Sequence, residues 1–168
     1  MFPTSLTDEA ARLLQALRTR GLKLATAESC TGGLIAALLT GVPGSSDVIE
    51  CGFVSYSNAA KVSMLGVAQS LLDQHGAVSE AVARAMAEGA LAHSQAHIAV
   101  AVTGVAGPGG SSVDKPVGLV HLGVARQGVA TLHRELRLGD IGRAPVRLAS
   151  VEAALQLIWR ALESPPDA

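Results

Sequence analysis

Hydrophobic positions recur along the chain with two periods, which predict alternating helices and strands. Near the start, Ala10, Leu13, Leu14 and Leu17 follow the i, i+3, i+4, i+7 spacing of one helix face. Gly21 ends this helix, in the place that glycine favours after a last helical turn. A mainly apolar run at 22–27 then predicts a strand.

Glycine and proline divide the rest of the chain into segments of the same two kinds. Ser57 or Asn58 caps one short helix, and Ser79 caps a longer one. The last five residues, 164–168, are expected to form a frayed tail. The remaining predicted helices cover 31–39, 59–65, 68–74, 80–94 and a segment from Arg143 or Ala144, and the remaining predicted strands cover 48–55, 98–103, 117–126 and 129–138.

Helices and strands alternate through the first part of the chain, and a hairpin around Gln127 and Gly128 follows. This order predicts a three-layer α/β/α fold with a mixed, largely parallel sheet. The 168 residues show no internal repeat and no linker. We therefore expect a single domain over residues 1–168.

Composition narrows the range of functions. About half of the residues are hydrophobic (49%), only 16% are charged, and the net charge is −1, so no basic face for nucleic acid is expected. No apolar run approaches the roughly 20 residues that span a bilayer, and the first residues lack the pattern of a signal peptide. Two cysteines make no disulfide framework. We expect a cytoplasmic protein that binds neither nucleic acid nor membrane.

The segment at 25–33 joins a predicted strand to a predicted helix and carries candidate chemistry. Ser29 is either the cap of the helix or, if Thr31 caps it, a free nucleophile. Gly32 and Gly33 allow a substrate or another backbone to approach closely. Backbone amides of this turn are candidates for stabilising an oxyanion.

Cys30 is the rival nucleophile, because a thiol at a helix N-terminus has a lowered pKa. Cysteine hydrolases usually pair the thiol with a histidine, and none of the five histidines here lies beside an acid in a recognisable pattern. His93 and His97 have helical spacing but no third metal ligand nearby, so no metal site is expected. The alternative for Cys30 is packing behind the turn.

Lys61 is the candidate base for Ser29. A lysine acts as a base only when burial or a nearby cation lowers its pKa, and its neighbours here are small and apolar. The alternative is a solvated lysine on a short helix. Tyr56, the single tyrosine, either contacts the substrate or packs at a strand end.

A glycine-rich loop at 104–116 follows the strand at 98–103, where α/β sheets bind ligands. It matches neither a Walker loop nor a dinucleotide fingerprint. Thr103, Gly104 and Gly107 are its candidate substrate contacts. Arg143 and Arg147, at the start of the last helix, either bind phosphate or lie in solvent.

Six ordered motifs resemble the C-terminal domain of the CinA family, whose stand-alone members are nicotinamide-mononucleotide amidohydrolases. The resemblance spans almost the whole chain. The motifs are T-A-E-S-C-T-G-G at 26–33, G-S-S at 44–46, G-F-V-S-Y-S-N-A-A-K at 52–61, G-A-V-S-E at 76–80, T-G-V-A-G-P-G-G at 103–110 and K-P-V-G at 115–118.

The resemblance implies the same three-layer fold and hydrolysis of the carboxamide of nicotinamide mononucleotide, in pyridine nucleotide recycling. It also implies a serine–lysine pair, which here is Ser29 and Lys61, with Tyr56 beside the site. The expected substrate contacts are Cys30, Thr31, Gly32, Gly33, Thr103, Gly104, Gly107, Arg143 and Arg147. No cofactor is required, and a homodimer is expected. The pyrophosphatase half of longer CinA proteins is absent from this sequence.

One segment departs from the family pattern. The family more often has Gly-Asp-Arg followed soon by a second arginine, whereas this chain reads G-D-I-G-R at 139–143. Arg147 fits the second arginine, and whether Arg143 replaces the first stays open. Two other functions also stay open: a nucleotide-binding regulatory module without catalysis, and an amidase for another small amide.

Overall fold

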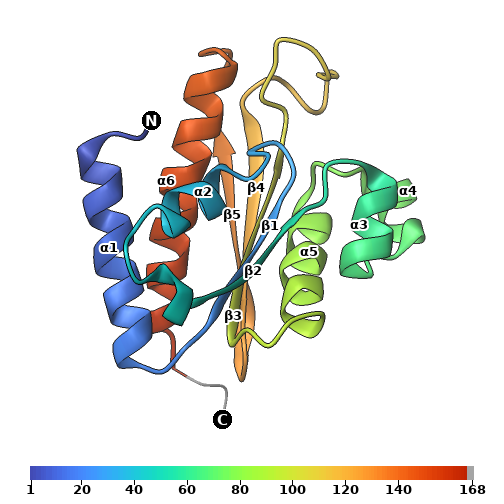
Figure 1. Cartoon of the computed structure of the whole chain (residues 1–168). Coiled ribbons are helices and arrows are strands. Elements are labelled where there is room, and N and C mark those ends of the chain that lie inside the picture. Colours follow the sequence, from blue (N-terminus) through green and yellow to red (C-terminus); the bar gives the residue numbers. More distant parts are fainter. Residues whose placement is uncertain (166–168) are drawn as a thin grey trace.

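A five-stranded sheet with helices on both faces forms the centre of the computed structural model, which describes residues 1–165 (Figure 1). The strand order is β2–β1–β3–β4–β5. β1 runs parallel to β2 and β3, whereas β4 is antiparallel to β3 and β5, so four of these strands share one direction. The strands are β1 (Leu24–Glu28), β2 (Ile49–Val54), β3 (Ile98–Gly104), β4 (Leu119–Arg126) and β5 (Val129–Arg137).

Helices cover both faces of this sheet and complete the predicted three layers. One face carries α1 (Thr4–Thr19), α2 (Leu34–Thr40) and α6 (Arg143–Glu163). The other carries α3 (Asn58–Leu65), α4 (Gln69–His75) and α5 (Glu80–Ala92), and a short 3₁₀ turn (Ser45–Asp47) precedes β2. None of the helices within residues 1–165 is both long and apolar enough to cross a membrane. Of the predicted tail, residues 166–168 lie outside the described part.

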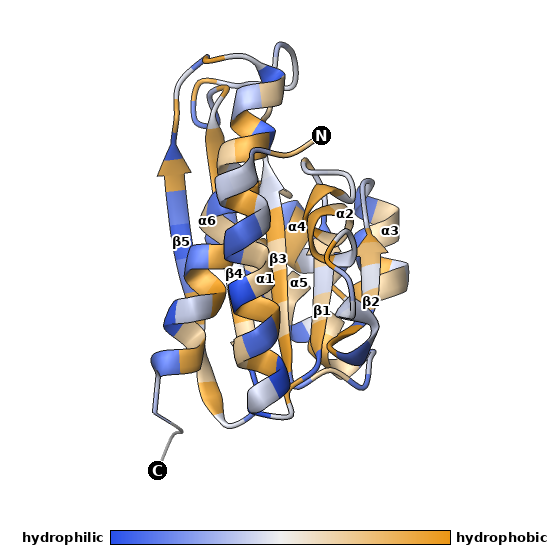
Figure 2. Ribbon diagram, turned by 60° about the vertical axis from the view of Figure 1, so that its left-hand side comes forward, coloured by the Kyte–Doolittle hydropathy of each residue, from blue (hydrophilic) through white to orange (hydrophobic). Residues whose placement is uncertain are grey.

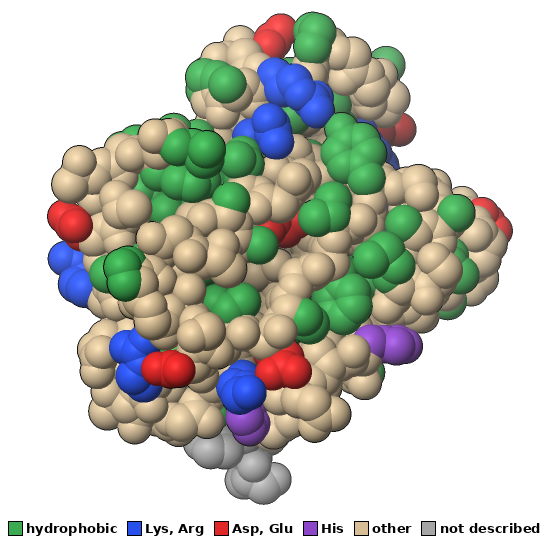
Figure 3. All heavy atoms as spheres, in the orientation of Figure 1, with side chains coloured by type: hydrophobic (Ala, Val, Ile, Leu, Met, Phe, Trp, Pro, Cys, Tyr) green, Lys and Arg blue, Asp and Glu red, His purple; other side chains and the backbone are tan. Residues whose placement is uncertain are grey.

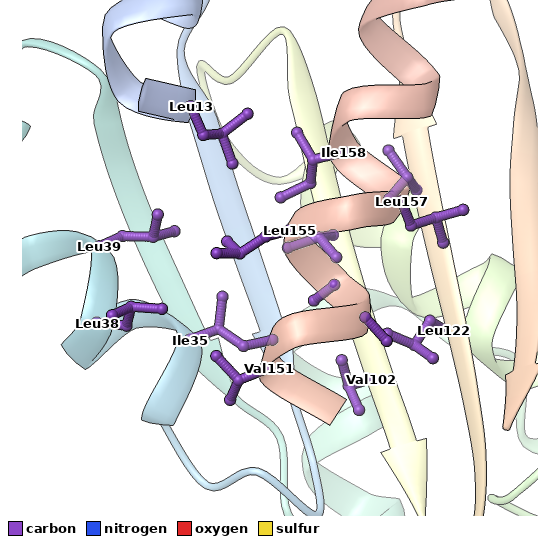
Figure 4. Packing of buried hydrophobic residues seen from close by; sticks show 14 of the residues in the cluster. Leu13, Ile35, Leu38, Leu39, Val102, Leu122, Val151, Leu155, Leu157 and Ile158 are labelled. Carbon is purple, nitrogen blue, oxygen red and sulfur yellow. The ribbon is translucent and has the colours of Figure 1, made fainter. Parts of the chain in front are cut away.

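The alternating residues of β3 produce two different cores. Ile98, Val100 and Val102 belong to a cluster of large aliphatic side chains that includes residues of α1, α2 and α6. Figure 4 shows Val102 among them. Ala99 and Ala101 point toward α5 and join a cluster rich in alanine. Because both faces are covered, β3 is hydrophobic along its length, in contrast with the hydrophilic edge strand β5 (Figure 2).

Small residues let α5 pack unusually close to its neighbours. A Cβ at Gly123 of β4 would lie 2.6 Å from the carbonyl oxygen of Ala83 in α5. A Cβ at Gly89 of α5 would lie only 2.0 Å from the carbonyl oxygen of Leu65 in α3. Glycine at these two positions therefore sets the distance of α5 from the sheet and of α3 from α5.

Most predicted elements are confirmed within a few residues, but the junction between β1 and α2 differs. β1 extends to Glu28, and α2 begins at Leu34 rather than at residue 31. Gly32 and Gly33 have φ angles of +58° and +98°, in the left-handed region, so the helix cannot begin before them. We call residues 29–33, which join the strand to the helix, the nucleophile turn.

Candidate active site

A pocket of about 260 Å³ opens at the carboxyl ends of the three parallel strands β1, β2 and β3. This edge of an open α/β sheet is the usual place for a ligand. A larger hollow of about 420 Å³ lies between α1 and α6, but its lining includes no serine–lysine pair. Of the predicted site residues, the pocket brings together Ser29, Cys30, Tyr56, Lys61, Thr103, Gly104, Gly107 and Arg143, and it leaves out Thr31, Gly32, Gly33 and Arg147.

Ser29 and Lys61 meet in this pocket. The Nζ of Lys61 lies 3.0 Å from the Oγ of Ser29, 2.9 Å from the carbonyl oxygen of Ser55 and 3.4 Å from that of Tyr56. A neutral amine has two N–H donors and one lone pair. It can therefore donate to the two carbonyl groups and accept the hydroxyl proton of Ser29, so this geometry fits a lysine that acts as a base.

The local fold explains why the amine is buried. The Oγ of Ser57 accepts a hydrogen bond from the N–H of Ala60 and caps α3, as predicted, which points Lys61 inward in the first turn. The side chain is 1% exposed. Burial lowers the pKa of the Lys61 amine below its usual value, because a charge is poorly solvated there.

Cys30 does not have the properties of the rival nucleophile. The residue is only 6% exposed and belongs to the aliphatic core. Burial raises the pKa of its thiol to about 12, so the expectation of a lowered pKa at a helix N-terminus is wrong. Cys30 packs behind Ser29 as a neutral thiol.

Glu28 is a site residue that the sequence analysis missed. Its carboxylate is 1% exposed and accepts hydrogen bonds from the N–H groups of Gly33, Ile35 and Ala36. Glu28 therefore caps α2, so neither of the two alternatives for this cap, Ser29 or Thr31, fills that role. The Thr31 hydroxyl is buried without a partner among the described residues. A single acid at the end of an apolar strand is the signal that could have revealed this role.

Tyr56 and Arg143 stand at the rim of the pocket. The guanidinium of Arg143 donates one hydrogen bond to the Tyr56 hydroxyl (3.0 Å) and another to the carbonyl oxygen of Gly107 (2.9 Å). Arg143 thus joins the end of β2 to the glycine-rich loop. Thr103 is buried and donates to the carbonyl oxygen of Ala77, whose segment also lines the pocket and was not predicted.

Arg147 lies one helical turn further along α6 and contacts the nucleophile turn instead of the pocket. Its Nε donates to the carbonyl oxygen of Cys30 (3.1 Å), and its Nη2 donates to that of Thr31 (2.9 Å). The two arginines, both expected to contact the substrate, therefore occupy different places.

Two histidines lie together on β4 and β5, outside the pocket lining. The Nδ1 of His121 is 2.9 Å from the Nε2 of His133, and the rings are stacked. Their outer nitrogens face Glu135 at 3.9 Å and Glu80 at 3.6 Å. Both histidines therefore lie beside an acid in the fold, although no recognisable pattern in the sequence indicates it. Within residues 1–165, no cluster of three or more His, Cys, Asp or Glu residues is placed to hold a metal ion.

Fold and site together define an α/β protein with a serine–lysine pair in a pocket at the strand ends. The family is the CinA C-terminal domain, whose model matches residues 6–162, and the chain belongs to it. A CinA-like protein of Chlorobium luteolum is 53% identical over 154 residues, which are 87% of this chain and 35% of that protein. One from Mycolicibacterium vanbaalenii is 50% identical over 155 residues, or 92% of this chain and 35% of that protein. The chain thus spans about a third of the length of these relatives.

Solved structures of the family share the whole fold. The competence/damage inducible protein CihA from Agrobacterium tumefaciens is 51% identical, with a TM-score of 0.94 over 98% of this chain and 99% of that one. A competence-damaged protein (CinA) superfamily protein from Escherichia coli is 30% identical, with a TM-score of 0.88 over 96% of this chain and 94% of that one. The fold is therefore retained at low sequence identity.

Proposed function

We propose that this protein is an amidohydrolase that converts nicotinamide mononucleotide to nicotinate mononucleotide and ammonia. The observation that carries the proposal is the 3.0 Å contact between the buried Lys61 amine and the Ser29 hydroxyl. Burying an amine costs folding free energy that hydrogen bonds only partly offset, and a depressed pKa in a pocket is typical of a catalytic base. The relatives' names describe competence and damage induction, so the choice of substrate rests on the family resemblance of the motifs.

The reaction proceeds by nucleophilic catalysis. Neutral Lys61 removes the hydroxyl proton of Ser29, whose Oγ attacks the carboxamide carbon. The tetrahedral oxyanion then collapses, the C–N bond breaks, and Lys61 returns the proton to the departing ammonia. Water, deprotonated by the same amine, hydrolyses the ester formed on Ser29 and releases the carboxylate product.

The rim of the pocket supplies the contacts for the rest of the nucleotide. A guanidinium binds phosphate through two parallel hydrogen bonds, and Arg143 is the arginine in the pocket lining. The glycine-rich loop after β3 presents backbone close to the ligand, since Gly107, Gly109 and Gly110 all line the pocket. Arg143 would exchange its Tyr56 and Gly107 contacts for the ligand phosphate.

Ser29→Ala tests the nucleophile directly. It should lower ammonia release from nicotinamide mononucleotide at least about 10³-fold while nucleotide binding survives, because only the attacking oxygen is lost. Cys30→Ala is the matched control and should retain most activity, since the thiol stays protonated. Near-normal turnover in Ser29→Ala together with an inactive Cys30→Ala would reverse the assignment.

A panel of amides assayed with the wild-type protein separates the remaining functions. Ammonia release from another small amide but not from the mononucleotide would retain the mechanism and change the substrate. Binding of the mononucleotide without ammonia release from any amide would make the chain a binding module and contradict the proposal.

A further inference from the structure

The nucleophile turn has hydrogen bonds that fix the direction of the peptide following Ser29. A peptide unit is planar and trans, so its C=O and its N–H point in opposite directions. The Ser29 carbonyl accepts a hydrogen bond from the N–H of Gly32 (3.0 Å). The N–H of Cys30, in the same peptide unit, must therefore point away from Gly32.

The N–H of Cys30 is the candidate oxyanion donor in the nucleophile turn. Cys30 lines the pocket, and its N–H has no backbone or side-chain acceptor in another residue within 1–165. In other serine hydrolases, the N–H of the residue after the nucleophile is one of the donors that stabilise the tetrahedral intermediate. The Gly33 amide, by contrast, is occupied by Glu28, so it is no longer a candidate donor.

Arg147 holds the turn from the α6 side. It binds the carbonyl oxygens of Cys30 and Thr31, the two peptide units that follow the Ser29–Cys30 unit. A Cβ on Gly32 would lie 3.3 Å from the Nη2 of Arg147, and Gly32 has φ +58°. The close approach of the guanidinium and the left-handed backbone therefore both favour glycine at this position.

Glu28 holds the turn through the opposite kind of hydrogen bond. It accepts from backbone amides, whereas Arg147 donates to backbone carbonyl groups. Its three bonds end at Gly33, Ile35 and Ala36, which fixes the last residue of the turn to the first turn of α2. With a carboxylate at this helix end, the positive end of α2 is neutralised. The end of α2 therefore offers no unpaired positive charge to an oxyanion.

We propose that Arg147 and Glu28 are positioning residues that orient the Ser29–Cys30 peptide, so that the N–H of Cys30 points to the place where the oxyanion forms. This inference rests on the proposed function in one respect, the identity of the natural substrate. The orientation itself is a property of the turn and applies to any electrophile that Ser29 attacks.

Arg147→Ala should lower kcat about 10- to 100-fold and leave KM for nicotinamide mononucleotide nearly unchanged, because an oxyanion donor acts only in the transition state. Arg147→Lys, which can still donate to one carbonyl oxygen, should recover part of this loss. Glu28→Gln keeps one side-chain oxygen as an acceptor. It should therefore lose less kcat than Arg147→Ala, and its KM should likewise stay unchanged.

Arg126→Ala is the matched control. Arg126 also donates to backbone carbonyl oxygens, those of Ala161 in α6 and of Ser164 just after it, but it lies at the far end of β4 from the pocket. It should lose thermal stability to a degree similar to Arg147→Ala and keep its kcat. An equal fall of kcat in both variants would mean that Arg147 is structural only and would overturn the proposal.

A fluorophosphonate probe tests the turn independently of the natural substrate. Ser29 Oγ attacks phosphorus, fluoride leaves, Lys61 accepts the hydroxyl proton, and the phosphoryl oxygen occupies the oxyanion position. Wild-type protein should be labelled on Ser29, Arg126→Ala equally fast, and Arg147→Ala about 10-fold or more slowly. If the wild type is labelled but releases no ammonia from the mononucleotide, the substrate proposal fails while this inference stands. Equal labelling of wild type and Arg147→Ala, or no labelling of the wild type above Ser29→Ala, overturns the inference.

Discussion

At the scale of single residues, the proposed mechanism depends on the buried amine of Lys61, whose pKa burial lowers. Lys61 is 1% exposed, and its amine contacts two carbonyl oxygens and one hydroxyl, with no carboxylate among its hydrogen-bond partners. Each of these contacts suits an amine that donates twice and accepts once. The position therefore favours reactivity over stability, as active sites often do.

The pH dependence of activity follows from Lys61. Because the neutral amine is the base, kcat/KM should rise with pH along its acidic limb, with a midpoint below the usual lysine value of 10.5. Lys61→Arg should lose about 10³-fold or more at every pH, since a guanidinium stays protonated. A pH–rate profile of both proteins checks this, and an acidic limb that persists in a still active Lys61→Arg would assign the titration to another group.

Stability should respond to Lys61 in a defined direction. Between the lowered folded pKa and 10.5, the unfolded chain binds a proton that the folded chain does not. The free energy of unfolding contributed by this group therefore rises as the pH rises through that window. Lys61→Met lacks this contribution, so urea unfolding should show the wild type gaining stability relative to Lys61→Met between pH 7 and pH 10. A constant difference would contradict the assignment.

Part of the site can be predicted from residue types and spacing alone. Ser29 and Lys61 belong to sequence motifs, and the structure places them in contact. The place of the Ala77 segment in the pocket depends on a contact with Thr103, 26 residues away in sequence, so no local pattern indicates it. The burial that raises the pKa of Cys30 likewise depends on the assembled core.

At the scale of elements, the close contact between α3 and α5, which we call the α3–α5 seam, determines where Lys61 lies in the site. α3 carries Lys61, and its last residue, Leu65, approaches Gly89 of α5 with no room for a methyl group. A shift of α3 would move the amine away from Ser29. The distance between these two helices is therefore a condition for the serine–lysine contact.

Gly89→Ala should destabilise the protein by about 3 kcal/mol, although alanine has the higher helix propensity, because its Cβ would overlap the Leu65 carbonyl group. Activity should fall as well, since relief of the overlap displaces α3. Ala92→Gly, at the exposed end of α5, is the comparison and should cost about 1 kcal/mol or less with normal kcat. Thermal unfolding and ammonia release measure both effects. A Gly89→Ala variant that is as stable as the wild type would show that α3 and α5 leave room for a methyl group at this position.

The period of the hydrophobic positions predicts which segments are helices and which are strands, but it does not predict the residues at which they end. The strand and helix on either side of the nucleophile turn were each displaced by one to three residues in the prediction, because the left-handed glycines and the Glu28 cap determine where they stop. The Ser57 and Ser79 caps were predictable, because the hydroxyl of each serine accepts a hydrogen bond from an N–H only a few residues further along the chain.

At the scale of the whole molecule, charges are sparse and mixed in sign. Figure 3 shows Lys, Arg, Asp and Glu side chains scattered over the face that it presents, without a broad patch of either sign. The main concentration of titratable groups inside the fold is the His121–His133 pair, which Glu80, Glu135, Arg84 and Lys115 influence. Burial lowers the pKa values of both histidines, which links folding of the β4–β5 hairpin to pH.

Global stability should therefore fall in mild acid. As the pH falls below about 6.5, the unfolded chain protonates these histidines before the folded chain does. The free energy of unfolding therefore decreases as the pH falls from 6.5 toward the lowered pKa values of the folded state. Above pH 6.5 the contribution of the two histidines to stability is complete. His133→Gln should flatten this slope in urea unfolding measured from pH 7.5 to pH 5. His75→Gln, at an exposed position, should leave the slope unchanged. An unchanged slope in His133→Gln would place the acid sensitivity elsewhere.

The unequal packing on the two faces of the sheet has a consequence for how lineages of this protein can drift. The aliphatic cluster under α1, α2 and α6 accepts exchanges among leucine, isoleucine, valine and methionine as long as total volume is kept. On the α5 face, Gly89 and Gly123 accept no larger residue, because backbone atoms already lie close to where a Cβ would go. Divergence should therefore be most limited at these two glycines, and Gly89 is the one against which α3, the helix that carries Lys61, packs.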